Sequence, residues 1–308
     1  MAAFSNILVI LGPTAAGKSQ LAHELARQVG AQILSVDSMQ IYKDMDVGTA
    51  KPTEAERRDV VHHLIDVVRP DELFTVARFV ELADDVVRTA RERHVPLIAT
   101  GGAPLYYQSL FVGLFSGPAA DPELRQRLSA MSDQELHARL AAVDPASAAR
   151  IHVNDTKRLI RALEVYELTG RPISSFQTEW AAARPRHAAT WVGLLWDREL
   201  LNSKINARVK SMMSAGWLDE TRRLLQRYGE LSRTAAEATG YRELIEHLRG
   251  RLSLDEATEL IKIATRQLAR KQMKWFKRFS NVTWIDGQLP LEDRLKLVWG
   301  IWQTGNHG

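Results

Sequence analysis

The segment Gly12–Ser19, GPTAAGKS, has the residue types and the spacing of a phosphate-binding loop. Glycines at both ends let backbone N–H groups turn toward an anion, and the start of a following helix strengthens that attraction. In this motif Lys18 reaches the terminal phosphates, and the hydroxyl of Ser19 binds Mg²⁺. The predicted phosphate site comprises Gly12, Pro13, Thr14, Ala15, Ala16, Gly17, Lys18 and Ser19. The motif alone does not distinguish ATP from another phosphorylated compound.

Asp37 is the second group that could do chemistry, because it ends a second apolar run, AQILSVDS at 31–38. Ligands of open parallel sheets bind at the carboxyl ends of the strands, so Asp37 should face the phosphates. An ionised carboxylate there could bind Mg²⁺ or act as a general base. Alternatively, Asp37 or Ser38 could be the N-cap of a helix over 39–45.

The periodicity of the chain predicts the elements that hold these groups. Helical spacing predicts helices at 18–29 and 75–94. Apolar runs that are typical of strands occupy residues 6–12, 31–38, 62–68, 95–102, 190–196 and 282–286. Strands that alternate with helices predict a parallel sheet with helices on both faces.

The pattern becomes almost purely helical between two loops, one near Gly117 and one near Arg186. We therefore predict an α/β fold whose core is a P-loop NTPase-like parallel sheet with an all-helical insertion domain. The core comprises residues 1–116 and 190–308, and the insertion comprises residues 117–189.

Composition excludes several classes of protein. The 308 residues include no cysteine, so disulfides, thiolate zinc sites and a cysteine nucleophile are excluded. No apolar run approaches the roughly 20 residues that cross a bilayer. The N-terminus also lacks the basic segment of a signal peptide. We expect a cytoplasmic protein with no membrane partner.

Positive charge is concentrated in the last third of the chain. Residues 201–278 contain 17 Lys/Arg against 9 Asp/Glu, although the whole chain carries only +4. A basic stripe recurs every four residues, at Lys262, Arg266, Arg270, Lys274 and Arg278. The opposite, buried side is expected to contain Ile261, Ala264, Leu268, Trp275 and Phe279. Such a stripe is typical of a surface that follows a nucleic-acid backbone, although a solvated helical surface remains the alternative.

Seven segments occur in the order of one known family. They are GPTAAGKS, SVDSMQIYKDMDVGTAKP, HHLIDVVRPDELFTVARF, GGAPLYYQSL, NDTKRLIRALEVYELTGRPIS, ATGYREL and ATRQLARKQMKWFKRF. From Ile10 to about Phe279 the chain closely resembles the tRNA dimethylallyltransferases, also called tRNA isopentenyltransferases.

The resemblance implies transfer of a dimethylallyl group from dimethylallyl diphosphate to N6 of an adenine. That adenine lies 3′-adjacent to the anticodon of a tRNA and leaves the anticodon stack to react. The phosphate loop then holds the donor's diphosphate with Mg²⁺ as cofactor, and Asp37 is the general base. Arg208 is a further candidate for diphosphate binding. We expect the enzyme to be a monomer.

The resemblance also implies the residues that contact the anticodon stem-loop of the tRNA. They are Asp37, Ser38, Met39, Gln40, Ala103, Arg125, Arg161, Ala162, Leu163, Glu164, Val165, Arg242, Arg270, Lys271 and Lys274. For Arg161 an ion pair with Glu164 is an equal alternative. The family usually has threonine where this chain has Ala103, so Thr100 or a water replaces that hydroxyl, or the hydroxyl is dispensable.

Two other functions share part of this pattern. A nucleotide or small-molecule kinase would have the same loop and sheet, with the insertion as its lid, but it leaves the basic stripe unexplained. A non-catalytic tRNA-binding module with a nucleotide switch would not need Asp37 for its function. The ordered set of motifs favours the transferase.

Overall fold

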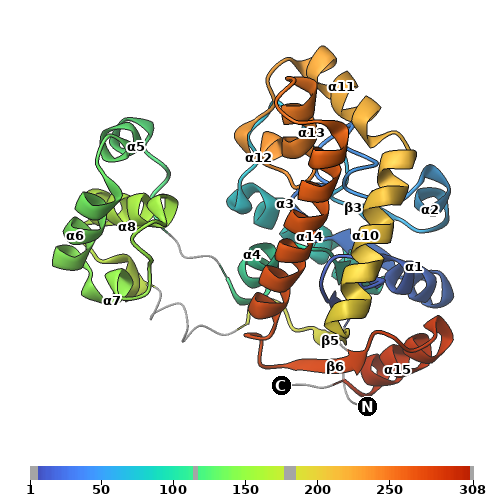
Figure 1. Cartoon of the computed structure of the whole chain (residues 1–308). Coiled ribbons are helices and arrows are strands. Elements are labelled where there is room, and N and C mark those ends of the chain that lie inside the picture. Colours follow the sequence, from blue (N-terminus) through green and yellow to red (C-terminus); the bar gives the residue numbers. More distant parts are fainter. Residues whose placement is uncertain (1–5, 114–116, 177–184, 306–308) are drawn as a thin grey trace. The chain divides into compact units, whose positions relative to one another are not determined.

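The computed structural model describes residues 6–113, 117–176 and 185–305 (Figure 1). The chain forms two compact units. The first combines Met1–Phe111 with His187–Gly308, and the second is Val112–Arg186. These boundaries differ by a few residues from the sequence-based range of 117–189 for the insertion.

The first unit is built on a parallel sheet, with six strands in the described residues in the order β3-β2-β4-β1-β5-β6. The strands are β1 Ile7–Leu11, β2 Gln32–Ser35, β3 His62–His63, β4 Leu97–Thr100, β5 Thr190–Leu195 and β6 Val282–Asp286. The third strand is much shorter than the predicted 62–68. It ends early because Leu64 and Asp66 adopt positive φ angles, which a strand cannot continue through.

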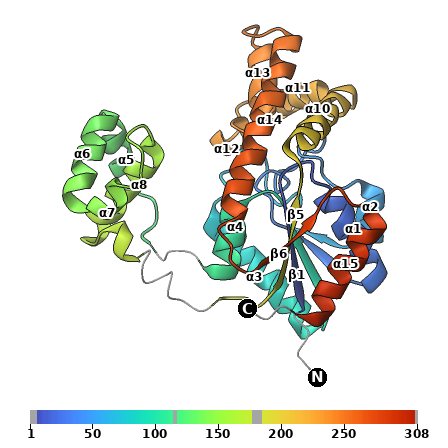
Figure 2. The ribbon, with the colours of Figure 1, turned by 60° about the horizontal axis from the view of Figure 1, so that its bottom comes forward.

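Helices cover both faces of this sheet (Figure 2). On one face lie α1 (Lys18–Val29) and α15 (Leu291–Thr304), whose apolar side chains share a core with Leu8 and Ile10 of β1. On the other lie α3 (Val76–Glu92), α4 (Pro104–Tyr107) and the π-helical turn η1 (Gln108–Val112). Alternate residues of β1 therefore pack into the apolar cores on the two faces of the sheet, which explains why its sequence is apolar throughout.

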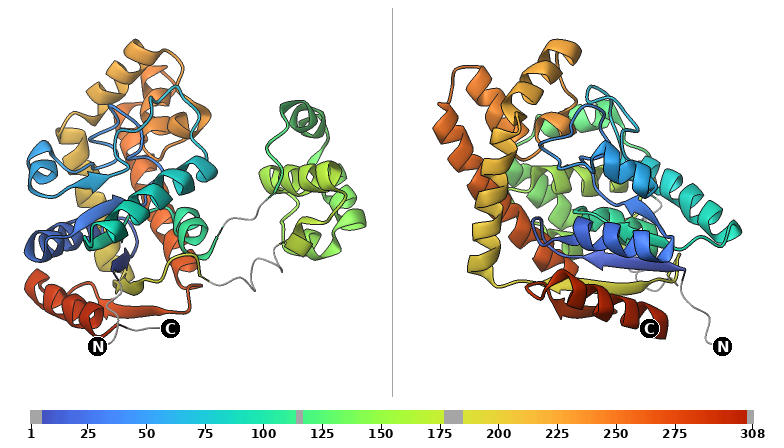
Figure 3. Two further views of the ribbon diagram at one scale, coloured as in Figure 1. Left: turned by 180° about the vertical axis from the view of Figure 1, so that it is seen from behind. Right: turned by 90° about the vertical axis from the view of Figure 1, so that its right-hand side faces the viewer.

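A helical layer extends from the sheet (Figure 3). Its long members are α10 (Arg198–Ser214) and α14 (Leu254–Phe276), which pack against each other. The shorter α11 (Trp217–Tyr228), α12 (Arg233–Ala236) and α13 (Tyr241–Leu248) pack at their far ends. The C-terminal part of α14 returns to the sheet, where Phe276 meets Tyr107 edge to face.

The segment between β2 and α3 is held by buried charges. It contains α2 (Glu54–Asp59), which opens with a capping box. The carboxylate of Glu220 in α11 is buried and accepts hydrogen bonds from the backbone N–H groups of Asp46 and Val47 at 2.9 and 2.7 Å. Lys51 is also buried, and its Nζ pairs with Asp46 and Asp66. The segment is therefore fixed at Asp46 and Val47 in its first half and at Asp66 in its second half.

Residues 173–176 are helical, and the other helices in the described part of the second unit are α5 Pro122–Ser129, α6 Asp133–Val143, α7 Pro145–Ala148 and α8 Thr156–Thr169. Each helix from α5 to α8 begins at an Asp or Ser whose side chain accepts a backbone N–H, as helix N-caps do. Leucines of α5, α6 and α8 form a core that belongs to this unit alone.

In the part of the chain that the structure describes, no helix is both long enough and apolar enough to cross a membrane.

Candidate active site

The phosphate loop joins β1 to α1 and has the backbone that the sequence predicts for it. Gly12 and Gly17 adopt φ angles of +151° and +86°, which strongly favour glycine. Gly17 is the N-cap of α1, so the helix begins at Lys18. The Nζ of Lys18 folds back over the loop and donates to the carbonyl oxygen of Pro13 at 2.8 Å.

The charge of Lys18 is in an unfavourable position in the free protein. The pKa of its ammonium group is lowered from 10.5 to about 7, mainly by burial and also by the nearby charge of Arg208, while Asp37 opposes both effects. An anion bound in the loop would offset this desolvation. Binding of a phosphate would therefore stabilise the charged form of Lys18.

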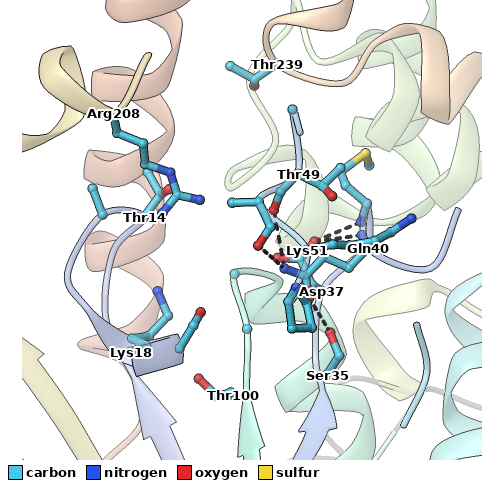
Figure 4. A pocket seen from close by; sticks show the side chains of 18 of the residues that line it. Thr14, Lys18, Ser35, Asp37, Gln40, Thr49, Lys51, Thr100, Arg208 and Thr239 are labelled. Carbon is cyan, nitrogen blue, oxygen red and sulfur yellow. Dashed lines mark hydrogen bonds between the residues drawn. The ribbon is translucent and has the colours of Figure 1, made fainter. Parts of the chain in front are cut away.

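The loop opens into a cavity of about 570 Å³ in the first unit. Thr14, Lys18 and Arg208 lie on one side of it, and Asp37 and Gln40 lie on the other (Figure 4). All residues from Thr14 to Ser19 line the cavity, and Gly12 and Pro13 are buried behind it. The predicted cationic and acidic groups thus share one cavity.

Asp37 lies two residues beyond the end of β2. Its Oδ1 accepts the backbone N–H groups of Met39 at 2.8 Å and Gln40 at 3.4 Å, which closes a tight turn. No helix occupies 39–45 in the described structure, so the interpretation of Asp37 or Ser38 as a helix N-cap is wrong. The turn directs the carboxylate into the cavity, together with Ser38 and Met39.

Gln40 has intramolecular partners for its whole amide group. Its Oε1 accepts the hydroxyl of Ser35 at 2.9 Å, and its Nε2 donates to the carbonyl oxygens of Thr49 and Ala50 at 3.3 Å. Gln40 therefore braces the cavity wall opposite the phosphate loop, whatever else it contacts.

Gln272 of α14 is a site residue that the sequence analysis missed. It is buried, its Oε1 accepts the N–H of Thr14 at 2.8 Å, and its Nε2 donates to the carbonyl oxygen of Gly102 at 2.7 Å. The side chain thus connects the phosphate loop to the end of β4. The only signal in the sequence is a neutral polar residue inside the segment RKQMKW.

Part of the cavity is apolar. The side chains there come from α10, α11 and α14: Ile205, Val209, Met212, Trp217 and Leu268. The expectation that Leu268 belongs to the buried side of α14 is wrong, because 36% of its surface is exposed, within this cavity. The amphipathic pattern missed this because an open cavity replaces a packed neighbour at that position.

The basic stripe on α14 is shorter than predicted. Lys262 is buried and its Nζ pairs with Glu259 at 2.5 Å, and Arg266 donates to Asn206 Oδ1 of α10 at 2.6 Å. Packing of α10 and α13 covers this half of the helix. The predicted contacts Arg270, Lys271 and Lys274 are exposed, as are Lys277 and Arg278 beyond the helix end.

Ala103 and Arg242 lie outside the cavity lining. Ala103 is buried as the N-cap of α4, and its methyl group makes no capping hydrogen bond. Thr100 does line the cavity, and its hydroxyl donates to the carbonyl oxygen of Ile10 at 3.4 Å.

Arg242 is exposed on α13, where its Nη2 pairs with Glu243 at 2.6 Å.

The predicted RNA-contacting segment of α8 is largely internal to the second unit. The side chains of Ala162, Leu163, Glu164 and Val165 are buried in the core of this unit, and contact of this segment with RNA stays a prediction. The carboxylate of Glu164 receives Arg125 at 2.8 Å and Arg161 at 2.5 Å. These pairs bear out the ion-pair alternative for Arg161, although both guanidinium groups remain partly exposed.

A parallel sheet with a phosphate loop after its central strand, and a carboxylate across the cavity, defines an α/β protein with a P-loop-like core. A family model described as IPP transferase matches residues 40–279, so the chain belongs to the IPP transferase family.

Curated relatives and solved structures agree with this assignment. The chain is 45% identical to a tRNA dimethylallyltransferase of Acetivibrio thermocellus over 91% of each chain. It is 43% identical to one of Geobacter metallireducens over 97% of this chain and 98% of the relative.

Two solved structures share the fold. The tRNA isopentenylpyrophosphate transferase of Bacillus halodurans is 34% identical with a TM-score of 0.72, covering 97% of both chains. A eukaryotic dimethylallyltransferase acting on tRNA is 26% identical with a TM-score of 0.77, covering 91% of this chain and 73% of that one.

Proposed function

We propose that this transferase moves a dimethylallyl group from dimethylallyl diphosphate to N6 of the adenine 3′-adjacent to the anticodon of tRNA. One observation carries the proposal: the phosphate loop, Arg208 and Asp37 surround one cavity that also has an apolar wall. That combination suits a donor with a charged diphosphate and a small apolar tail. The names of the curated relatives do not favour a kinase.

The proposed reaction forms one C–N bond and breaks one C–O bond. The N6 amine attacks C1 of the dimethylallyl group, and the electron pair of the C–O bond leaves with the diphosphate. Loop N–H groups, Lys18 and Arg208 stabilise the departing negative charge. Asp37 accepts the proton that N6 loses. A general base must reach that proton, and the carboxylate of Asp37 lines the cavity in which N6 would react.

We propose that Mg²⁺ binds at this site together with the diphosphate, whose oxygens would provide most of its ligands. Ser19 is exposed and lines the cavity, so its hydroxyl can provide one ligand. The described residues contain no cluster of three or more His, Cys, Asp or Glu side chains that could hold a metal. Diphosphate oxygens and waters would supply the other ligands, as is usual for Mg²⁺. When bound, the ion supplies additional charge neutralisation for the leaving group.

The RNA surface in this proposal includes the exposed end of α14, with Arg270, Lys271 and Lys274. Arg242 and the partly exposed Arg125 and Arg161 are further proposed contacts to the anticodon stem-loop. We also propose that the monomer is the active form. A tRNA substrate also implies action in the cytoplasm.

A transfer assay tests the function. Unmodified tRNA with adenines in the anticodon loop is mixed with Mg²⁺ and labelled dimethylallyl diphosphate, with ATP in a parallel reaction. Asp37→Asn is the matched variant, because its amide oxygen can still accept the N–H of Met39 and keep the turn. We expect the wild type to label tRNA and the variant to lose on the order of 10²–10⁴-fold in rate.

The same assay separates the alternatives. Turnover of ATP without labelling of tRNA would replace the transferase with the kinase. Full activity of Asp37→Asn would remove Asp37 as the base and leave the transferase intact.

A further inference from the structure

Arg294, near the start of α15, is a buried arginine that the proposed reaction does not use. Only 7% of its surface is exposed, and it does not line the cavity. Its Nη1 lies beside the phosphate loop, since a methyl group added to Gly17 would stand 3.1 Å from that nitrogen. The absence of a side chain at position 17 makes room for the guanidinium.

The guanidinium has no counter-charge in the described part of the chain. Its Nε and Nη1 are buried without hydrogen-bond partners there, and no charged neighbour of Arg294 is found among those residues. Burial accordingly lowers the pKa of Arg294. A buried charge without a partner is costly, so such groups usually meet a ligand or another charge.

Buried cations elsewhere in the first unit do have carboxylate partners. Lys51 pairs with Asp46 and Asp66, and Lys262 pairs with Glu259. The two buried cations without a carboxylate partner in the described residues, Lys18 and Arg294, both lie against the phosphate loop. Their common neighbourhood indicates that the missing counter-charge is an anion bound in that loop.

We propose that Arg294 is a positioning residue for the diphosphate. Its guanidinium lies on the α15 side of the phosphate loop, and its positive charge attracts the diphosphate bound on the other side of that loop. This inference rests on the proposed function and adds a residue to the proposed diphosphate site. The loop binds the diphosphate of the donor and the diphosphate that is released as product. Arg294 thereby strengthens the binding of inorganic pyrophosphate, the second product, as well as of the prenyl donor.

The test compares Arg294→Met with Lys296→Met, which removes the same charge from an exposed position on the same helix. The probe is inorganic pyrophosphate with Mg²⁺, measured by calorimetry and by the rise in Tm that it causes. We expect about tenfold weaker pyrophosphate binding by Arg294→Met and no change for Lys296→Met. The Tm of the ligand-free Arg294→Met protein should equal or exceed that of the wild type, because an unpaired buried charge has been removed.

A purely structural role predicts the opposite pattern, with a lower Tm in the free protein and unchanged pyrophosphate affinity in the folded fraction. That pattern would overturn the inference. If Arg294→Met does not fold, Arg294→Lys tests the inference instead, because it keeps the charge and should bind pyrophosphate within a few-fold of the wild type. Loss of binding there, in a folded protein, also overturns it.

The two proposals fail in different ways. A wild type that binds no pyrophosphate and transfers no prenyl group overturns the proposed function and this inference together. A wild type that transfers the prenyl group, with an Arg294→Met variant that binds pyrophosphate equally well, overturns the inference alone.

Discussion

At the scale of single residues, Lys18 links burial to ligand binding. Its pKa of about 7 in the free protein means that much of it is neutral in mildly alkaline solution. A bound diphosphate favours the charged form, so binding above this pKa must take up a proton. The contribution of Lys18 to affinity is therefore complete below about pH 7 and falls as pH rises, by at most roughly tenfold per unit.

Calorimetry of pyrophosphate binding at about pH 8, in buffers of different ionisation enthalpy, measures that proton directly. The wild type should take up more protons than Lys18→Arg, whose guanidinium stays charged. Equal proton uptake by the two proteins would show that Lys18 is already charged in the free enzyme.

The sequence predicted some of these residues better than others, for a physical reason. The phosphate loop depends on local backbone requirements, such as the positive φ of Gly17, and local requirements are visible in a motif. Gln272 acts across 258 residues, on the N–H of Thr14. No local pattern distinguishes it from an ordinary polar side chain, so only the fold reveals it.

At the scale of elements, α1 and α14 differ in how far the sequence determines them. The predicted bounds of α1, 18–29, are confirmed, because glycines flank the helix at Gly17 and Gly30. For α14 the period of four predicted one continuous basic face. Tertiary packing decides which part of that face meets solvent: Lys262 is buried, and the half-buried Arg266 is bonded to Asn206 of α10.

The exposed end of α14 therefore carries the prediction for RNA binding. Lys274→Gln should weaken tRNA binding and reduce the slope of log affinity against log salt by about 1, since one phosphate contact is lost. Binding titrations at several salt concentrations measure the slope. Lys296→Gln on α15 is the control, and an unchanged slope for Lys274→Gln would remove this lysine from the RNA surface.

Gln272 carries a second prediction for α14, as the connection between the phosphate loop and β4. Gln272→Met keeps the volume but loses the hydrogen bonds to Thr14 and Gly102. Misplacement of the loop should lower kcat/KM for the donor by roughly 10–100-fold. Gln267→Met, at an exposed position on the same helix, is the control for steady-state kinetics. Matching kinetics for the two variants would show that the loop holds its position without Gln272.

At the scale of the whole molecule, the change from strands to helices after residue 116 was enough to predict a separate helical unit. Each unit has its own apolar core, one around the sheet and one around the leucines of α5, α6 and α8. The sequence could not tell which charged residues of the insertion face solvent. Its helical pattern left Glu164 ambiguous, whereas the structure buries it completely.

A substitution of Glu164 tests whether the two units have independent cores. Burial alone would raise the pKa of its carboxyl group, but hydrogen bonds from Arg125 and Arg161 and from the N–H of Asp121 hold the pKa below its usual value. Glu164→Gln should therefore destabilise the second unit by about 2 kcal/mol, because the hydrogen bonds from Arg125 and Arg161 lose the charge on their buried acceptor. Glu123→Gln, at an exposed position on α5, should change it little.

Because the cores are separate, the loss should stay within the second unit. Hydrogen exchange should accelerate in α5, α6 and α8, while the amides of α1 and the affinity for pyrophosphate remain unchanged. Prenyl transfer to tRNA should fall if the second unit contributes to RNA binding, as proposed for Arg125 and Arg161. Faster exchange in α1 as well would mean that the two units unfold as one cooperative body, and Glu164 would then support the whole enzyme.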